Sequence, residues 1–182
     1  FVPVRFKKIY FNWLKNIHDW NLSQQITWGI RIPAWFRNGS EFGVQGSGIK
    51  SKNIYVGLDA PEDEEWKQDP DVFTTWFSSS QWPYLTLGYP DSKDFKTFYP
   101  TDVMETGWDI LLFWITRMVM LGLYRTKKVP FKTVYLHGLV RDKDRQKMSK
   151  SKGNVIDPLG VAAQYGTDAV RMALIIGNGV GK

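Results

Sequence analysis

The sequence contains no cysteine and only two histidines among its 182 residues. The absence of thiols excludes disulfide bonds and thiolate metal sites, and it is typical of a protein from a reducing compartment such as the cytoplasm. Two histidines are too few for a histidine-built metal centre, so we expect no metal site formed by the protein itself. No basic and apolar signal segment opens the chain, and it begins with Phe1, which predicts a fragment of a longer protein.

Long uncharged hydrophobic runs are also absent. The most apolar stretch, residues 108–124, contains Asp109 at its start and is interrupted by Arg117. A membrane-spanning helix needs about 18 or more uncharged residues, so we interpret this stretch as a buried core helix and expect no membrane partner. Hydrophobic residues make up 43% of the chain, which is enough for one globular domain with its own core.

Charge is distributed unevenly along the chain, whose net charge is +6. Residues 141–152 carry six basic side chains against two acidic ones, whereas residues 59–71 are strongly acidic. We interpret the acidic run as a solvated face. The basic run is suited to binding phosphates.

Hydrophobic periodicity predicts the elements of the first half. Residues 9–17 have the spacing of a short amphipathic helix, and residues 26–35 are predicted to form a strand and turn broken at Pro33. The glycine-rich residues 38–52 predict a hairpin or loose insertion, closed by a strand at 53–58. We therefore expect a small β insertion at residues 37–70.

The second half predicts a strand, a helix and a strand at residues 101–106, 108–124 and 133–140. This order is typical of the parallel crossover of an α/β fold. Asp157 as N-cap, with Pro158 in the first turn, predicts a helix that ends near Gly166, and Thr167 begins another that runs to residue 176. We assign residues 157–182 to the start of a helical junction.

The most informative motif is the loop Lys147-Met148-Ser149-Lys150-Ser151. Its lysine ammonium groups can act as mobile charges on polyphosphate oxygens. A solvated turn is the simpler interpretation of a loop rich in lysine and serine. The flanking strings TVYLHGLV (133–140) and GNVIDP (153–158) extend the pattern and favour phosphate binding.

A second group of residues lies where the first predicted strand becomes a helix. Gly107 lets the backbone approach a ligand closely, and the carboxylate of Asp109 in the first helical turn can accept both hydroxyls of a ribose. An ordinary first-turn acid, favoured by the helix dipole, is the alternative for Asp109. Glu105 lies on the same approach, and a solvent-facing strand residue is its alternative.

Together these motifs resemble the valyl-tRNA synthetase family of class I aminoacyl-tRNA synthetases. The loop 147–151 resembles the class I signature loop, and the resemblance covers nearly the whole chain through the strings WG (28–29), RIPAW (31–35), TWFSS (75–79), TDV (101–103), TGWDI (106–110) and PFKTVY (130–135). Isoleucyl and leucyl relatives share the loop, but TWFSS and PFKTV favour valine. The implied fold is α/β: the second half of a Rossmann-like class I synthetase catalytic domain, with parallel strands.

The resemblance implies activation of valine by ATP with Mg²⁺, then transfer of the valyl group to tRNA(Val). Lys150 would grip the departing phosphates, assisted by Lys147. Trp28 and Trp76 would form walls of the valine pocket, with core packing as their alternative. His137 would lie near adenine, with a packed strand histidine as its alternative. The implied ATP-binding residues are Glu105, Gly107, Asp109, His137, Gly138, Leu139, Met148, Ser149 and Ser151.

The chain departs from the family pattern in several places. A His-Ile-Gly-His-type motif is absent from the sequence, so this chain alone is expected to be inactive, within a parent enzyme expected to be a monomer. Gln24 stands where the family usually has arginine, Ile30 where it has histidine and Thr74 where it has aspartate. Each change removes a polar or charged group near the implied pocket, so we expect reduced activity even in the parent enzyme. An isoleucine-specific relative is one alternative. A non-catalytic module that binds nucleic acid or a partner is another.

Overall fold

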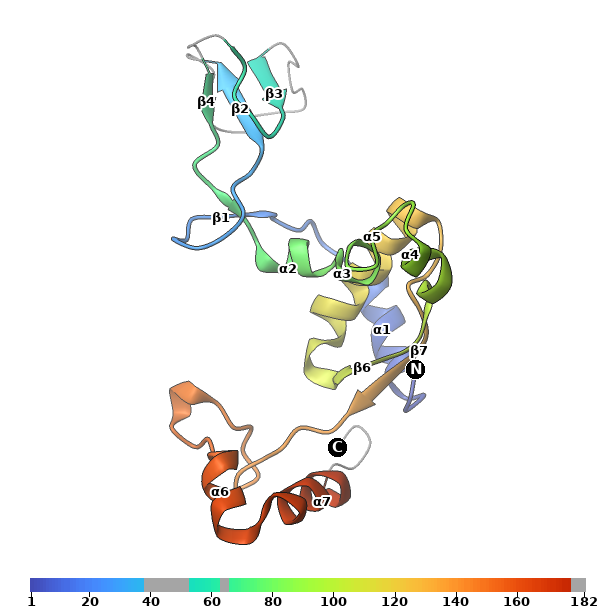
Figure 1. The fold of residues 1–182 in the computed structure, drawn as a ribbon, viewed down its shortest axis with the longest axis vertical. Helices are drawn as coiled ribbons and strands as arrows, with labels where there is room; N and C mark the ends of the chain where they lie inside the picture. The colour runs from blue at the N-terminus through green and yellow to red at the C-terminus, as the bar shows by residue number, and fades with distance from the viewer. Residues whose placement is uncertain (38–52, 63–65, 178–182) are drawn as a thin grey trace. The chain divides into compact units, whose positions relative to one another are not determined.

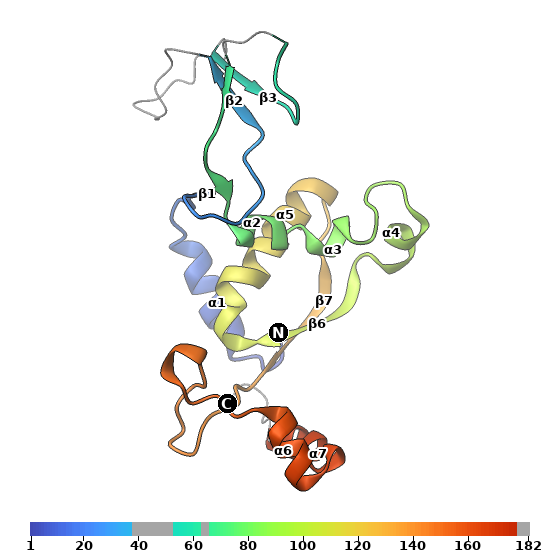
Figure 2. The same ribbon diagram turned by 60° about the vertical axis from the view of Figure 1, so that its left-hand side comes forward.

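The computed structural model describes residues 1–37, 53–62 and 66–177 (Figures 1 and 2). The hairpin or insertion predicted at 38–52 lies outside these ranges. The chain divides into two compact units, one formed by Phe1–Ile17 with Ser80–Lys182 and the other by His18–Ser79. No helix within the described ranges is long and apolar enough to span a membrane.

The first unit is built on two parallel strands, β6 (Thr101–Gly107) and β7 (Phe131–His137). Their register runs from Thr101 opposite Phe131 to Gly107 opposite His137, so the strands begin and end level. A 3-10 turn (Trp108–Ile110), a π-helical turn (Leu111–Ile115) and helix α5 (Thr116–Thr126) connect them. The predicted strand, helix and strand order is confirmed, and with it the α/β fold class.

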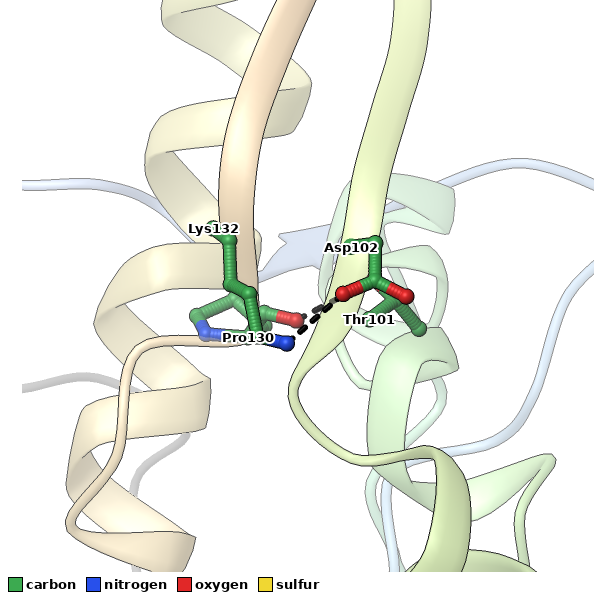
Figure 3. A network of polar contacts seen from close by, with 4 residues as sticks. All are labelled: Thr101, Asp102, Pro130 and Lys132. Atoms are coloured by element: carbon green, nitrogen blue, oxygen red, sulfur yellow. Dashed lines mark hydrogen bonds and ion pairs between the residues drawn. The ribbon is translucent and has the colours of Figure 1, made fainter.

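The amino ends of β6 and β7 are fixed to each other by polar contacts (Figure 3). The Thr101 amide and hydroxyl both donate to the Pro130 carbonyl, at 3.0 and 3.2 Å. One residue further along each strand, the Lys132 ammonium lies 2.6 Å from the Asp102 carboxylate, and both side chains are exposed. The two hydrogen bonds fix the start of the pairing, whereas the ion pair joins exposed side chains and contributes little to its stability.

The hydrophobic core lies on one face of this strand pair. Leu111, Ile115 and Met118 from the connecting helix pack with Leu136 of β7, and each is exposed by 1% or less. Helix α1 (Phe6–Lys15) adds Phe6 and Tyr10 to the same cluster, so the helix predicted at 9–17 is confirmed with an earlier start.

Two details of the predicted elements are wrong. The helix after Gly107 contributes to the core, as predicted, but it is buried on one side only and leaves Tyr124 71% exposed. The second strand ends at His137 rather than at residue 140. It ends there because its partner β6 ends at Gly107, opposite His137, so residues 138–140 have no neighbouring strand with which to pair.

The remaining helices of the first unit are α3 (Trp82–Leu85), α4 (Lys93–Phe98), α6 (Pro158–Tyr165) and α7 (Thr167–Gly177). Asp157 caps α6, since its carboxylate accepts the Leu159 and Gly160 amides at 3.1 and 3.0 Å. Gly166 ends α6 at φ 92°, a backbone conformation that favours glycine. The two predicted C-terminal helices are therefore confirmed, while their place in a helical junction stays a prediction.

The strands of the second unit pair antiparallel. Strands β2 (Ala34–Arg37), β3 (Ile54–Val56) and β4 (Trp66–Gln68) form one sheet in the order β3-β2-β4. Strands β1 (Ser23–Gln24) and β5 (Val72–Phe73) form a second pair, followed by helix α2 (Thr75–Ser79). The strand predicted at 53–58 is confirmed as the shorter β3, and the insertion bounds 37–70 stay a prediction.

The strand predicted at 26–35 is wrong over most of its length. Residues 26–33 contribute a single antiparallel bridge, Arg31 to Val72, and β2 begins directly after Pro33. Proline has no amide hydrogen for a strand ladder, so the regular pairing starts one residue later. Gly29 lies against Val72, and a Cβ atom on it would come within 2.7 Å of a valine methyl group.

Candidate nucleotide-binding site

The candidate site lies at the carboxyl ends of β6 and β7, where Gly107 pairs with His137. The chain leaves β6 into the turn that carries Asp109. It leaves β7 through Gly138 and Leu139 toward the basic loop, which we define as residues 141–152. Two parallel strands that end level bring the segments following them to the same edge. This is the edge at which doubly wound folds bind nucleotides.

Gly107 is buried at the centre of this edge. A Cβ atom on it would lie 2.7 Å from Asp109 Oδ1, 3.3 Å from Leu139 Cδ2 and 3.6 Å from His137 Cε1. Its backbone angles, φ −62° and ψ 140°, are ordinary for any residue. Gly107 is therefore required for space rather than for backbone conformation, and the absent side chain lets three predicted site residues lie together.

Asp109 is also in contact with the basic loop. The Lys147 ammonium lies 2.5 Å from Asp109 Oδ2, although 38 residues separate the two along the chain. The carboxylate side chain is 24% exposed and the lysine side chain 57% exposed. The Asp109 turn and the basic loop therefore meet at one edge of the strand pair.

His137 is held in a fixed orientation at the end of β7. Its Nε2 lies 3.3 Å from Glu105 Oε1, and its Nδ1 lies 2.6 Å from the Gly138 carbonyl oxygen. Both ring nitrogens therefore face oxygen acceptors. The Glu105 carboxylate contacts the histidine ring across the strand pair while its side chain stays 59% exposed, so its role in the site stays a prediction.

The basic loop begins with a small hairpin. Arg141 bridges Lys147, the Asp142 amide donates to the Gln146 carbonyl at 3.0 Å, and Arg145 adopts a left-handed conformation at φ 61°. The pKa of Asp142 lies below the ordinary aspartate value because Asn154 and the Gln146 amide donate hydrogen bonds to its carboxylate.

The second part of the loop carries the remaining motif residues. Met148 and Ser149 are half-buried, and the Ser149 and Ser151 hydroxyls lie 2.7 Å apart. Lys150 opens a 3-10 turn, Lys150–Lys152, that ends at Gly153 with φ 66°. Its ammonium is exposed and has no partner within the part of the chain that the structure describes. Lys147 and Lys150 therefore differ, since the first is paired and the second is solvated.

The two predicted pocket tryptophans belong to the second unit. Trp28 is 83% exposed, and Trp76 is half-buried in α2. Their role in a valine pocket stays a prediction. The effects of the nearby departures are likewise predictions: Ile30 is 61% exposed, and Thr74 is 2% exposed.

Sequence reasoning missed two residues of the loop, Asp142 and Asn154. Asp142 was counted as one of the two acidic side chains in the basic run, and Asn154 as part of the string that follows the loop. The structure joins them by a hydrogen bond of 2.7 Å. The available signal was their residue type, because aspartate and asparagine often hydrogen-bond nearby backbone groups in turns.

Comparison with known proteins decides the family. The family described as tRNA synthetases class I (I, L, M and V) matches residues 1–182. The chain belongs to this class I synthetase family. It is 49% identical to the valine–tRNA ligase of Bacillus subtilis (strain 168) and 51% identical to that of Geobacillus kaustophilus (strain HTA426), with all of this chain covered. This chain spans 20% of the length of these two relatives.

Solved structures show the same fold. One is a leucyl-tRNA synthetase of Agrobacterium radiobacter K84, in a ternary complex with tRNA and LeuAMS. The structural similarity covers 97% of this chain and 28% of the leucyl-tRNA synthetase chain, with a TM-score of 0.70 and 19% sequence identity. The methionyl-tRNA synthetase of Mycobacterium tuberculosis bound by methionyl-adenylate matches 93% of this chain and 27% of its own, with a TM-score of 0.59 and 23% identity.

Proposed function

We propose that this chain forms the second half of the nucleotide-binding catalytic domain of a valine–tRNA ligase. That enzyme would join valine to ATP as valyl-adenylate and then transfer the valyl group to tRNA(Val). Identity of about 50% to valine–tRNA ligases over the whole chain supports the choice of amino acid. The alternative of a non-catalytic binding module has no comparable support.

The observation that carries the proposal is the contact between Asp109 and Lys147. A ribose and its phosphates are joined within a few bonds, so groups that bind them must lie at one place. Asp109 offers a carboxylate for the ribose hydroxyls, while Lys147 and Lys150 offer ammonium groups for the phosphates. The contact between the turn and the loop supports one shared ATP site.

The remaining site residues are proposed to bind the base and to shape the loop. Gly138 and Leu139, next to His137, would present main-chain groups to adenine, with Glu105 holding the histidine ring. Met148, Ser149 and Ser151 would shape the segment that carries the two lysines. Trp28 and Trp76 would line the valine pocket.

In the proposed reaction a valine carboxylate oxygen attacks the α-phosphorus of ATP, and the bond to the pyrophosphate oxygen breaks. ATP would enter as its Mg²⁺ complex. The chain's contribution is to position the reactants and to stabilise negative charge that develops on the phosphates. We propose that the enzyme acts as a monomer in the cytoplasm.

The test is the Lys150→Ala variant in the full-length enzyme. Valine-dependent exchange of pyrophosphate into ATP should fall by about 10²–10³-fold, as expected for the loss of one transition-state donor. Lys132→Ala is the matched control, because it removes an exposed lysine at the far end of the strands. Equal exchange rates for Lys150→Ala and the unaltered enzyme would contradict the phosphate role.

Specificity has its own test. The same exchange assay with isoleucine in place of valine separates the valine-specific enzyme from an isoleucine-specific relative. We expect a higher kcat/KM for valine. A higher kcat/KM for isoleucine would show that the enzyme is isoleucine-specific, and it would not contradict the proposed ATP site.

A further inference from the structure

The side chain of Asn154 connects both ends of the basic loop. Its Oδ1 accepts the Ser149 amide at 2.9 Å, and its Nδ2 donates to Asp142 Oδ2 at 2.7 Å and to the Lys147 carbonyl at 3.3 Å. The amide group of Asn154 therefore links three parts of the chain: Asp142 before the two lysines, the backbone of Lys147 and Ser149 between them, and residue 154 after them.

Asp142 extends the same network into the hairpin. Its Oδ1 accepts the Gln146 amide at 2.8 Å and the Asp144 amide at 3.0 Å, while Oδ2 is occupied by Asn154. Hydrogen bonds to a charged carboxylate are stronger than neutral ones. The lowered pKa of Asp142 is consistent with this, since these donors favour its charged form.

The network fixes the backbone on both sides of Lys147, whose side chain reaches Asp109. Asn154 binds the carbonyl of Lys147 itself and the amide of Ser149, two residues further on. A lysine side chain is flexible, so the backbone from which it extends decides where its ammonium can act.

We propose that Asp142 and Asn154 are positioning residues that hold the backbone of the basic loop in the conformation required for phosphate binding. This inference rests on the proposed function, because the loop's lysines are assigned to the phosphates of ATP. Neither side chain needs to touch the substrate. Both act through the backbone of residues 146–149.

The chemistry of the pair allows a reciprocal exchange. In Asn154→Asp, two carboxylates face each other. In Asp142→Asn, two amide groups face each other, and turning either amide over places a donor against a backbone N–H. In the double variant the new amide at position 142 can donate to the new carboxylate at position 154. The acceptors for the Gln146 and Ser149 amides are then retained. A carboxylate oxygen at position 154 would face the Lys147 carbonyl, to which the Asn154 amide donates, so the recovery should be partial.

The experiment measures pyrophosphate exchange in the full-length enzyme. Each single variant should lower kcat by about 10- to 100-fold, the size of effect expected from misplacing a catalytic group by about an ångström. The double variant should recover at least part of the loss. Asp157→Asn is the control, because this carboxylate accepts two backbone amides at the start of α6 and lies outside the network. It should retain the unaltered rate.

Two further measurements keep the result interpretable. Trypsin should cleave within residues 141–152 faster in the single variants than in the double variant, and the thermal midpoint should be the same in all of them. Equal kcat in the single variants and the unaltered enzyme, while Lys150→Ala is inactive, would overturn this inference alone. A Lys150→Ala variant with normal exchange would instead overturn the phosphate role on which the inference rests.

Discussion

At the scale of single residues, Gly107 shows how a missing side chain shapes the site. The space where its Cβ would lie is bordered by Asp109, Leu139 and His137. We predict that Gly107→Ala raises the KM for ATP by about tenfold in the exchange assay, since a methyl group 2.7 Å from Asp109 Oδ1 must displace the carboxylate.

The matched control for that variant is Gly177→Ala. A Cβ atom on Gly177 would meet no atom within 4 Å, so the same substitution adds a methyl group in open space. Its KM for ATP should not change. An unchanged KM in Gly107→Ala as well would show that the carboxylate position does not matter for ATP binding.

At the scale of helices and strands, the sequence predicted the elements whose ends are set by residues within them or next to them. Asp157 followed by Pro158 fixes the start of α6, and Gly166 fixes its end. Alternating residues predicted β6 and β7, and the crossover order predicted their parallel pairing. The end of β7 could not be predicted from residues 138–140 themselves, because it depends on where the neighbouring strand β6 ends. The contact between Asp142 and Asn154 joins residues 12 positions apart, which no periodicity reveals.

The strand pair also allows a stability prediction. Leu136 is fully buried against the connecting helix, so Leu136→Ala should lower the free energy of unfolding by about 2–5 kcal/mol. Asp102→Asn removes an exposed ion pair and should cost less than about 1 kcal/mol. Urea titration of the chain, followed by tryptophan fluorescence, measures both. Similar losses in the two variants would contradict the view that burial, rather than the ion pair, stabilises the pair of strands.

At the scale of the whole molecule, the chain carries the turn and the loop of the proposed ATP site but lacks a His-Ile-Gly-His-type motif. The resemblance assigns that motif to the other half of the nucleotide-binding fold. Asp109, Lys147 and Lys150 would then contact ATP without the groups that complete its surroundings. Positioning and charge stabilisation both require the complete set of groups, so a partial set cannot supply the required lowering of the barrier.

We therefore predict that the isolated 182-residue chain forms no valyl-adenylate in a single-turnover assay with labelled valine and ATP with Mg²⁺. The full-length enzyme under the same conditions is the positive control and should form about one adenylate per active site. Far-ultraviolet circular dichroism of the isolated chain should show helix and strand, so that inactivity is not the result of unfolding. Stoichiometric adenylate from the isolated chain would show that Asp109 and the basic loop are sufficient for activation. The histidine motif would then not be required for the first step of the reaction.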